Sequence, residues 1–129
     1  MWFKKKKNIT RSGPQKEQQA CEWLQEQKFN ILEQNYLCKG GEIDIIALSP
    51  PQSDNESTLV FIEIKYRKNS LYGHPSEFVT PKKQQRIIRC AQLFLLKHPA
   101  LTHLPMRFDV ITFEGSQTTP NWIKNAFGV

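Results

Sequence analysis

The sequence predicts a mixed α/β fold in which two helices flank a single sheet. Residues 13–28 and 81–97 repeat their apolar positions at helical spacing, whereas residues 42–48 and 58–67 are short apolar runs rich in β-branched residues. The expected order is one helix, three strands, a second helix and a further strand. At 129 residues the chain is long enough for one domain with a sizeable core, which we place at residues 13–129.

The first helix is expected to begin at Gly13-Pro14 and to run to about Lys28. Glu17 falls on the same side of it as Cys21 and Leu24, so this carboxylate is predicted to face inward. The preceding residues 1–12 are basic and without pattern, and we interpret them as a flexible arm. A solvated tail is the preferred interpretation of the arm, and contact with phosphates is the alternative. A first strand is expected over 31–37, followed by a turn at 39–41.

The next two strands, 42–48 and about 58–67, are apolar but carry charges at their centres. If Ser49 faces Thr58 across an antiparallel hairpin, counting back residue by residue places Asp44 opposite Glu63. Strand alternation then puts Lys65 on the same face as Glu63. Because buried charge is costly unless it is paired or binds a metal, these strands predict a functional site.

Thr80-Pro81 is a strong helix start, with Thr as the N-cap and Pro in the first turn. The helix is expected to continue to about Lys97 and to bury four apolar side chains, namely Ile87, Ala91, Phe94 and Leu95. Residues 107–113 alternate as a further strand. The aromatic segment 122–127 is expected to pack on the domain as a tail.

The bulk composition limits the partners and the compartment. A net charge of +6 and a pI near 9.3 favour an anionic partner, with nucleic acid first and an acidic membrane surface second. The three cysteines are odd in number and lack a CxxC pair, which argues against a disulfide framework and a zinc site and fits a cytoplasmic protein. Cys21 and Cys90 are expected to be small core residues. No apolar stretch is long enough to span a membrane, and the start lacks the pattern of a signal peptide.

Asp44 followed by Glu63-Ile64-Lys65 forms a D…ExK pattern, which points to a site for Mg²⁺ or Mn²⁺. The expected metal ligands are the two carboxylates and the backbone carbonyl of Ile64. Lys65 would position the nucleophile or stabilise the transition state, and Glu17 would be an additional ligand or act through water. The alternative is an ion pair of Lys65 with Glu63 or Asp44 at a sheet edge. Glu42 is interpreted as a solvated strand-end residue rather than a ligand.

A succession of motifs resembles the YraN-like family of uncharacterised bacterial proteins. It comprises Gly13-x-x-Lys16-Glu17-x-x-Ala20, Asn35, Gly41-Glu42-Ile43-Asp44-Ile45-Ile46-Ala47, Val60 to Arg67, Gly73, Lys82-Lys83 and Arg107-Phe108-Asp109-Val110. The resemblance covers about residues 13–127. It implies a restriction-endonuclease-like fold of the PD-(D/E)xK nuclease superfamily, similar to archaeal Holliday-junction resolvases. It also implies that Glu17, Asp44, Glu63 and Lys65 form the catalytic set, and it leaves a homodimer open.

The chain departs from the family pattern at three places. Lys16 stands where the family usually has Gly, Ile43 replaces the Pro of the superfamily motif, and the 50–57 loop is longer than usual. None of these changes removes a proposed ligand.

Basic residues beyond the central strands are candidates for binding DNA phosphates, with a solvated helix face as the equal alternative. They are Arg67, Lys68, Lys82, Lys83, Arg86 and Arg89, together with the Lys4–Lys7 arm. Tyr66, Tyr72 and Phe78 are candidates for stacking on unpaired bases, although core positions are the preferred interpretation. Gln84 and Gln85 are candidates for orienting water, against plain solvent exposure. Asp109 lies in an apolar strand with no partner evident from the sequence.

Three hypotheses follow. The first is a Mg²⁺- or Mn²⁺-dependent nuclease acting on DNA, with branched DNA such as Holliday junctions as the substrate that the resemblance implies. The second is a non-catalytic nucleic-acid-binding module built on a nuclease fold. The third and weakest is a protein-interaction subunit that uses the 122–127 tail.

Overall fold

A computed structural model of the chain describes residues 13–52, 56–67, 79–115 and 119–128. Their order is α1 (Gly13–Glu26), β1 (Asn30–Cys38), β2 (Gly41–Leu48), β3 (Leu59–Arg67), α2 (Pro81–Lys97), a short 3₁₀ turn η2 (Pro99–Leu101), β4 (Met106–Glu114) and β5 (Asn121–Phe127). The expected arm at residues 1–12 lies outside the described residues. Among the described helices, none is long and apolar enough to cross a membrane.

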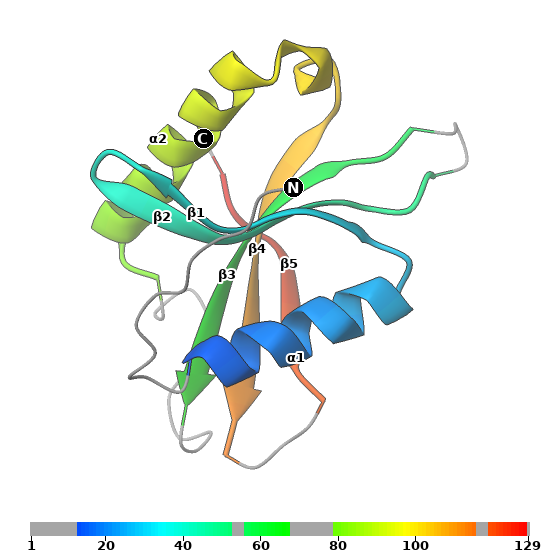
Figure 1. Ribbon diagram of the computed structural model, residues 1–129. Helices are drawn as coiled ribbons and strands as arrows, with labels where there is room; N and C mark the ends of the chain where they lie inside the picture. The colour runs from blue at the N-terminus through cyan, green and yellow to red at the C-terminus, as the bar shows by residue number, and fades with distance from the viewer. Residues whose placement is uncertain (1–12, 53–55, 68–78, 116–118, 129) are drawn as a thin grey trace.

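The strands form one sheet in the order β1-β2-β3-β4-β5. Neighbouring strands are antiparallel, except that β3 and β4 are parallel and are connected through α2. The helices lie on opposite faces of the sheet, as Figure 1 shows. This α/β arrangement confirms the predicted fold class and agrees with a restriction-endonuclease-like architecture. The aromatic segment 122–127, expected to be a tail, is part of the fifth strand and pairs with β4.

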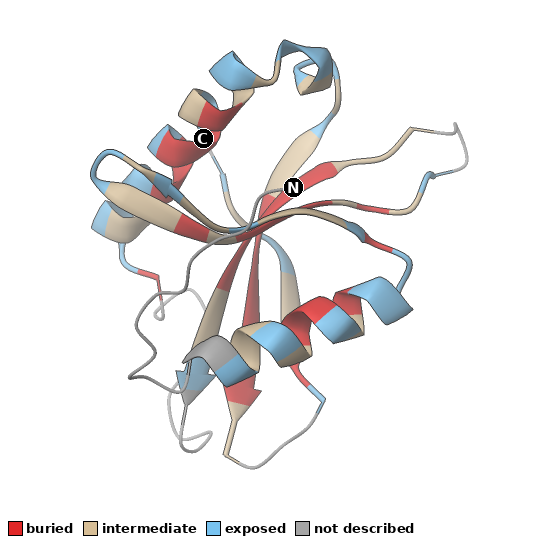
Figure 2. Cartoon of the chain, viewed as in Figure 1, coloured by how far each residue is buried: buried red, intermediate tan, exposed pale blue. Residues whose placement is uncertain are grey.

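Each face of the sheet carries its own hydrophobic core, and buried residues along the central strands alternate between the two. Figure 2 shows that the buried residues gather in these strands and in parts of both helices. On the α1 face, Ala20 and Leu24 pack over Val60 and Ile62. On the α2 face, the core is rich in aromatic rings and is centred on Phe61, Phe94 and Phe108. The central strands are therefore covered on both faces, which explains their nearly continuous apolar sequence.

The predicted register between the two central strands is confirmed over the part of the hairpin that pairs. Ile45 lies opposite Ile62, and the pairing continues to Leu48 opposite Leu59. The ladder ends at the Ile45–Ile62 pair, so the predicted pairing of Asp44 with Glu63 is not formed. Beyond that point β2 stays paired with β1 while β3 continues beside β4, so the sheet divides at Asp44.

A bend in the β1–β2 hairpin accompanies this division. Asn35 adopts a positive φ of 53°, and it lies between the Gln34–Ile45 and Tyr36–Ile43 pairs, opposite Asp44. Asparagine is one of the few non-glycine residues that tolerates this conformation. The bent hairpin projects towards α2, away from the lower half of β3 (Figure 1). Asn35 thus marks the point where the edge of the sheet opens.

Helix α2 begins as predicted, with Pro81 in the first turn and Thr80 as the N-cap. The Thr80 hydroxyl accepts a hydrogen bond of 3.2 Å from the Lys83 backbone N–H. Asp109 on β4 is fully buried and has partners that the sequence did not reveal. Its carboxylate accepts hydrogen bonds from the Arg107 guanidinium, the Trp122 indole and the Asn125 backbone N–H. Asp109 is therefore a structural charge that joins β4 to β5.

Candidate active site at the division of the sheet

The divided sheet encloses a cavity of about 380 Å³. Its walls are α1, the β1–β2 hairpin, β3 and the first turns of α2. It is lined by Lys16, Glu17, Leu37, Gly40, Gly41, Glu42, Asp44, Glu63, Ile64, Lys65, Tyr66, Lys83, Arg86 and Ile87. The lining contains four carboxylates and four basic side chains, so this cavity combines acidic ligands with groups able to bind phosphate. All four residues that the D…ExK pattern and the inward helix face predicted as catalytic line it.

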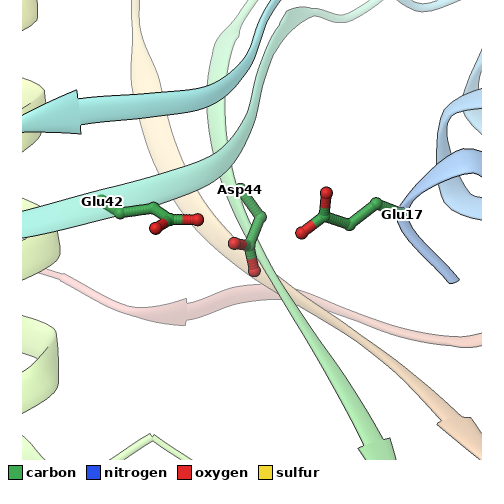
Figure 3. A group of neighbouring side chains, drawn as sticks. All are labelled: Glu17, Glu42 and Asp44. Carbon is green, nitrogen blue, oxygen red and sulfur yellow. The ribbon is translucent and has the colours of Figure 1, made fainter. Parts of the chain in front are cut away.

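Three of the carboxylates converge. One oxygen from each of Glu17, Glu42 and Asp44 lies within 4.8 Å of the others, and all three side chains are half-buried. Figure 3 shows Asp44 between Glu42, which precedes it on β2, and Glu17, which reaches across from α1. Glu42, which the sequence analysis interpreted as a solvated strand-end residue, is thus half-buried and lines the cavity beside Asp44. Because alternate residues of a strand share a face, Glu42 and Asp44 point the same way.

Asp44 substitutes for the missing backbone ladder. Its carboxylate oxygen Oδ2 accepts a hydrogen bond of 2.8 Å from the backbone N–H of Ile64, which lies on β3 beyond the last paired residue. Burial raises the pKa of Asp44 well above its usual value, and the charge of Glu63 raises it further, while the Ile64 hydrogen bond lowers it. The geometry thus concentrates negative charge at Asp44, and a cation would relieve it.

Glu63 is the most buried of the four carboxylates that line the cavity, with 4% of its surface exposed. Its oxygen Oε2 lies 2.8 Å from the ammonium nitrogen of Lys83 and 3.6 Å from that of Lys65. The Glu63–Lys65 ion pair considered from the sequence is therefore present, but it lies inside the cavity and includes a second lysine. An ion pair on the surface would contribute little to stability. Here the carboxylate is buried, so removing a lysine partner would leave a costly uncompensated charge.

The two lysines differ in their environments. Burial lowers the pKa of Lys65, and the neighbouring charge of Lys83 lowers it further. Burial also acts to lower the pKa of Lys83, but the hydrogen bond and charge of Glu63 outweigh it, so the Lys83 pKa is raised. Lys83 thus holds its proton firmly as the closest counter-ion of Glu63. The sequence placed Lys83 among the phosphate-binding candidates and gave no sign of this contact.

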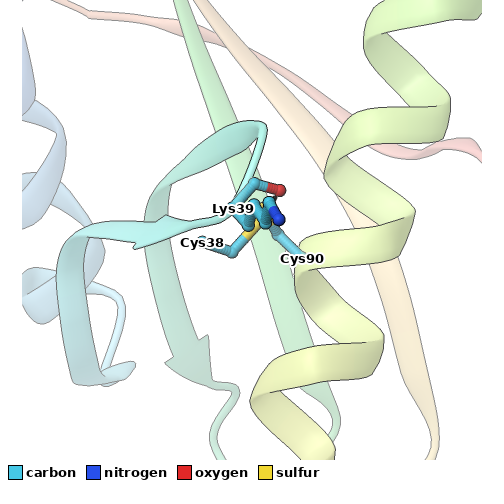
Figure 4. Close-up of a disulfide and its surroundings, with 3 residues drawn as sticks. All are labelled: Cys38, Lys39 and Cys90. Carbon is cyan, nitrogen blue, oxygen red and sulfur yellow. Dashed lines mark hydrogen bonds between the residues drawn. A yellow bond between two sulfur atoms is a disulfide. The ribbon is translucent and has the colours of Figure 1, made fainter.

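A disulfide joins two walls of the cavity. Cys38, at the end of β1, is bonded to Cys90 on α2, with 5.6 Å between their Cα atoms (Figure 4). The expectation that the cysteines form no disulfide is therefore wrong: Cys90 is buried as expected, but it is covalently bonded. The bent hairpin brings Cys38 to α2, a tertiary contact that sequence spacing cannot reveal. Gly41 packs beside this bond, and a Cβ built there would lie 3.2 Å from the Cys90 sulfur. Cys21 is a buried free cysteine, as expected.

Of the other residues predicted to contact nucleic acid, some line the cavity and others do not. Arg86 is exposed and lines it, whereas Lys82 and Arg89 are exposed outside its lining. Tyr66 lines the cavity and is 40% exposed, with the Lys16 ammonium 5.2 Å from its ring centre. Gln84 donates a hydrogen bond to the Val79 carbonyl.

The remaining candidates are not described far enough to place their side chains. Arg67 ends β3, and only its backbone is described. Lys68, Tyr72 and Phe78 lie outside the described residues.

Comparison with known proteins gives one consistent result. The model of a family described as "Uncharacterised protein family UPF0102" matches residues 16–113. A UPF0102 protein of Pseudomonas fluorescens is 40% identical, with 90% of this chain and 92% of the relative covered. UPF0102 proteins of Alcanivorax borkumensis and Psychromonas ingrahamii are 40% and 44% identical, with coverage of 97% and 86% of this chain and 95% and 84% of the relatives. The family resemblance expected from the motifs is thus confirmed, and the names of these relatives state no activity.

Proposed function

The chain belongs to the uncharacterised protein family UPF0102, and we propose that it is a divalent-metal-dependent nuclease that hydrolyses phosphodiester bonds of DNA. One observation carries this proposal. Glu17, Glu42 and Asp44 converge in a cavity that also contains the Lys65 and Lys83 ammonium groups. Acidic ligands beside basic groups are the combination that phosphoryl chemistry requires, because the reaction needs both a metal and positive charge near the phosphate.

The donor set fits Mg²⁺ or Mn²⁺. Both are hard cations that prefer oxygen, and the cavity offers carboxylates from three elements of the fold together with the backbone of Ile64. Asp44, Glu63 and the Ile64 carbonyl are the proposed ligands, and Glu17 and Glu42 are additional carboxylates beside them. When bound, such an ion lowers the pKa of a coordinated water and neutralises charge on a scissile phosphate.

The protein's own side chains would perform the remaining tasks. Lys65 borders the carboxylates with 29% of its side chain exposed, so its ammonium is available to donate a hydrogen bond to a phosphate oxygen. Arg86 is on the exposed surface of α2 at the cavity, where its guanidinium suits a neighbouring phosphate of the same strand. Tyr66 presents a partly exposed ring on which an unpaired base would stack.

A second candidate function is non-catalytic binding of nucleic acid. The observation in its favour is that Glu63 already has two cationic partners within the protein, so its charge is balanced without a metal. A binding module of this kind would bind DNA through Arg86 and its neighbours, with strong salt dependence and no effect of metal.

Cleavage of a labelled panel of DNA substrates distinguishes the two functions. The panel comprises a four-way junction, a flap, a single strand and a duplex, each incubated with Mg²⁺ or Mn²⁺. Asp44→Asn serves as the matched inactive control because Asn keeps an acceptor for the Ile64 N–H. We expect metal-dependent cleavage by the wild type and none by the variant. Tight binding of the panel without cleavage under either metal would reject the nuclease in favour of the binding module.

A further inference from the structure

Glu63 and Lys83 form a close ion pair, and it lies at the proposed metal site. The two atoms, Glu63 Oε2 and Lys83 Nζ, are 2.8 Å apart. The Glu63 side chain is 5% exposed, whereas that of Lys83 is 38% exposed. The carboxylate is therefore fixed in the interior, while the ammonium group has a route to solvent.

The fold holds the backbone of Lys83 in a defined place. Lys83 lies in the first turn of α2, where its N–H is capped by the Thr80 hydroxyl. Its side chain crosses from α2 to the carboxylate on β3. The preceding residue, Lys82, lies on the same helical turn but is exposed and does not line the cavity. The chain thus supplies a matched pair of lysines, of which one contacts Glu63.

A metal ion and Lys83 would compete for the same negative charge. A cation near 3 Å from a buried carboxylate neutralises much of its charge, and it repels any second cation placed beside that carboxylate. Removal of the lysine leaves a buried carboxylate without its closest counter-ion, which is strongly unfavourable until another cation replaces it. The affinity of the site for a divalent ion should therefore rise when Lys83 is removed.

We propose that Lys83 is an internal counter-ion that weakens metal binding at Glu63 until a substrate phosphate draws its ammonium group away. This inference rests on the proposed function, since it concerns the same metal site. A phosphate oxygen at the cavity would offer Lys83 a second anionic partner, and its partly exposed side chain would move to it. Metal and nucleic acid would then each increase the affinity for the other, because binding linkage is reciprocal. The ion pair would restrict metal loading to the substrate complex.

The first test is the affinity for Mn²⁺ without nucleic acid, measured from the electron paramagnetic resonance signal of free Mn²⁺. Lys83→Met should bind Mn²⁺ about tenfold more tightly than the wild type, a magnitude typical of removing one nearby positive charge. Lys82→Met, the matched control, should bind like the wild type. Lys83→Gln should behave like Lys83→Met and replaces it if the Met variant does not fold. Equal or weaker Mn²⁺ binding by the folded Lys83 variants would overturn the inference.

The second test concerns the coupling between metal and nucleic acid. The dissociation constant of the four-way junction is measured with Ca²⁺ and with EDTA, for the wild type and for Lys83→Met. Ca²⁺ should tighten binding by a larger factor in the wild type, because only there does phosphate binding release Glu63. If Ca²⁺ tightened junction binding by the same factor in both proteins, the inference that Lys83 moves to a substrate phosphate would be overturned. Failure of the wild type and all variants to bind Mn²⁺ or Ca²⁺, with or without DNA, would instead reject the proposed nuclease itself.

Discussion

The carboxylate of Asp44 accepts a 2.8 Å hydrogen bond from the Ile64 backbone N–H at the point where β2 and β3 separate. A side chain thus completes a backbone ladder, and the same side chain lies among the carboxylates of the cavity. The position that lets Asp44 accept this hydrogen bond also holds its negative charge close to the other carboxylates, which is electrostatically unfavourable. This conflict leads to the first prediction.

Asp44→Asn should stabilise the metal-free protein at neutral pH while abolishing cleavage. Asp44 has a pKa raised above its unfolded value, so the folded state binds the proton more tightly. The stability that Asp44 contributes is therefore fully present below its unfolded pKa of about 4. It is lost as the pH rises through the folded pKa. Asn removes the charge and keeps the acceptor. We expect a gain of about 1 kcal/mol in the free energy of unfolding at pH 7, measured by urea denaturation with EDTA. A gain that is equally large at pH 3 would contradict this explanation.

Mg²⁺ or Mn²⁺ should stabilise the wild-type protein through the converging carboxylates. A ligand that binds only the folded state, present at 100 times its dissociation constant, raises the free energy of unfolding by about 2.7 kcal/mol. The measurement is the melting temperature with metal and with EDTA. Glu17→Gln should reduce the gain, whereas Glu26→Gln, an exposed position on the same helix, should leave it unchanged. An equal rise in melting temperature with metal in both variants would show that Glu17 is not part of the metal site.

Arg86 should contribute to DNA binding more than Arg89. Both are exposed on α2, but only Arg86 lines the cavity. If Arg86 contacts a phosphate, Arg86→Gln weakens binding and reduces the slope of the affinity against salt by about 1. Arg89→Gln is the matched control and should preserve the slope. Fluorescence anisotropy over a range of salt concentrations measures both, and identical slopes in the two variants would place the DNA elsewhere.

Reduction of the disulfide should destabilise the fold without exposing Cys21. The bond joins residues 52 apart, and a loop of that length lowers the entropy of the unfolded chain by an amount worth about 4 kcal/mol. Cys38→Ser/Cys90→Ser should lose stability up to that size in urea denaturation. Burial raises the pKa of Cys21 to about 12, so a thiol reagent should label nothing in the native protein and one thiol after unfolding. Three labelled thiols without a reductant would show that the bond is absent.

Asp109 should behave in the opposite way to Asp44. Its carboxylate accepts hydrogen bonds from Arg107, Trp122 and Asn125, and it joins β4 to β5. Asp109→Ala leaves the partly buried Arg107 guanidinium and Trp122 indole N–H without this partner and should cost about 1–3 kcal/mol in urea denaturation. A loss below 1 kcal/mol would mean that water replaces the carboxylate.

Much of the site could be predicted because it depends on local rules. The hairpin register followed from the strand boundaries, and the inward position of Glu17 followed from helical spacing. Glu42 was also within reach of such rules, because it shares a strand face with Asp44. Its position in the cavity was missed because a charged residue near a turn is ordinarily solvated. Here α1 lies across the cavity and brings Glu17 close to Glu42.

Other features could not be predicted because they depend on tertiary contacts. The contact between Lys83 and Glu63 requires knowing how α2 lies against β3, and the Cys38–Cys90 bond requires the bend at Asn35. The contacts of Asp109 with Trp122 and Asn125 required recognising 121–127 as a strand. In each case the two residues are far apart in the sequence, and their meeting is set by packing rather than by a local pattern.

The disulfide also changes what a broken backbone would mean for this protein. Between Cys38 and Cys90 lie Glu42, Asp44, Glu63, Lys65, Lys83 and Arg86, and only Glu17 of the proposed catalytic set lies outside. A single proteolytic cut anywhere in this interval would leave two peptides tied together by sulfur. A nicked molecule would therefore migrate as one species on a non-reducing gel and separate only when reduced. Protease susceptibility of this chain has to be assayed with a reductant in the gel, because without it a cut protein would be counted as whole.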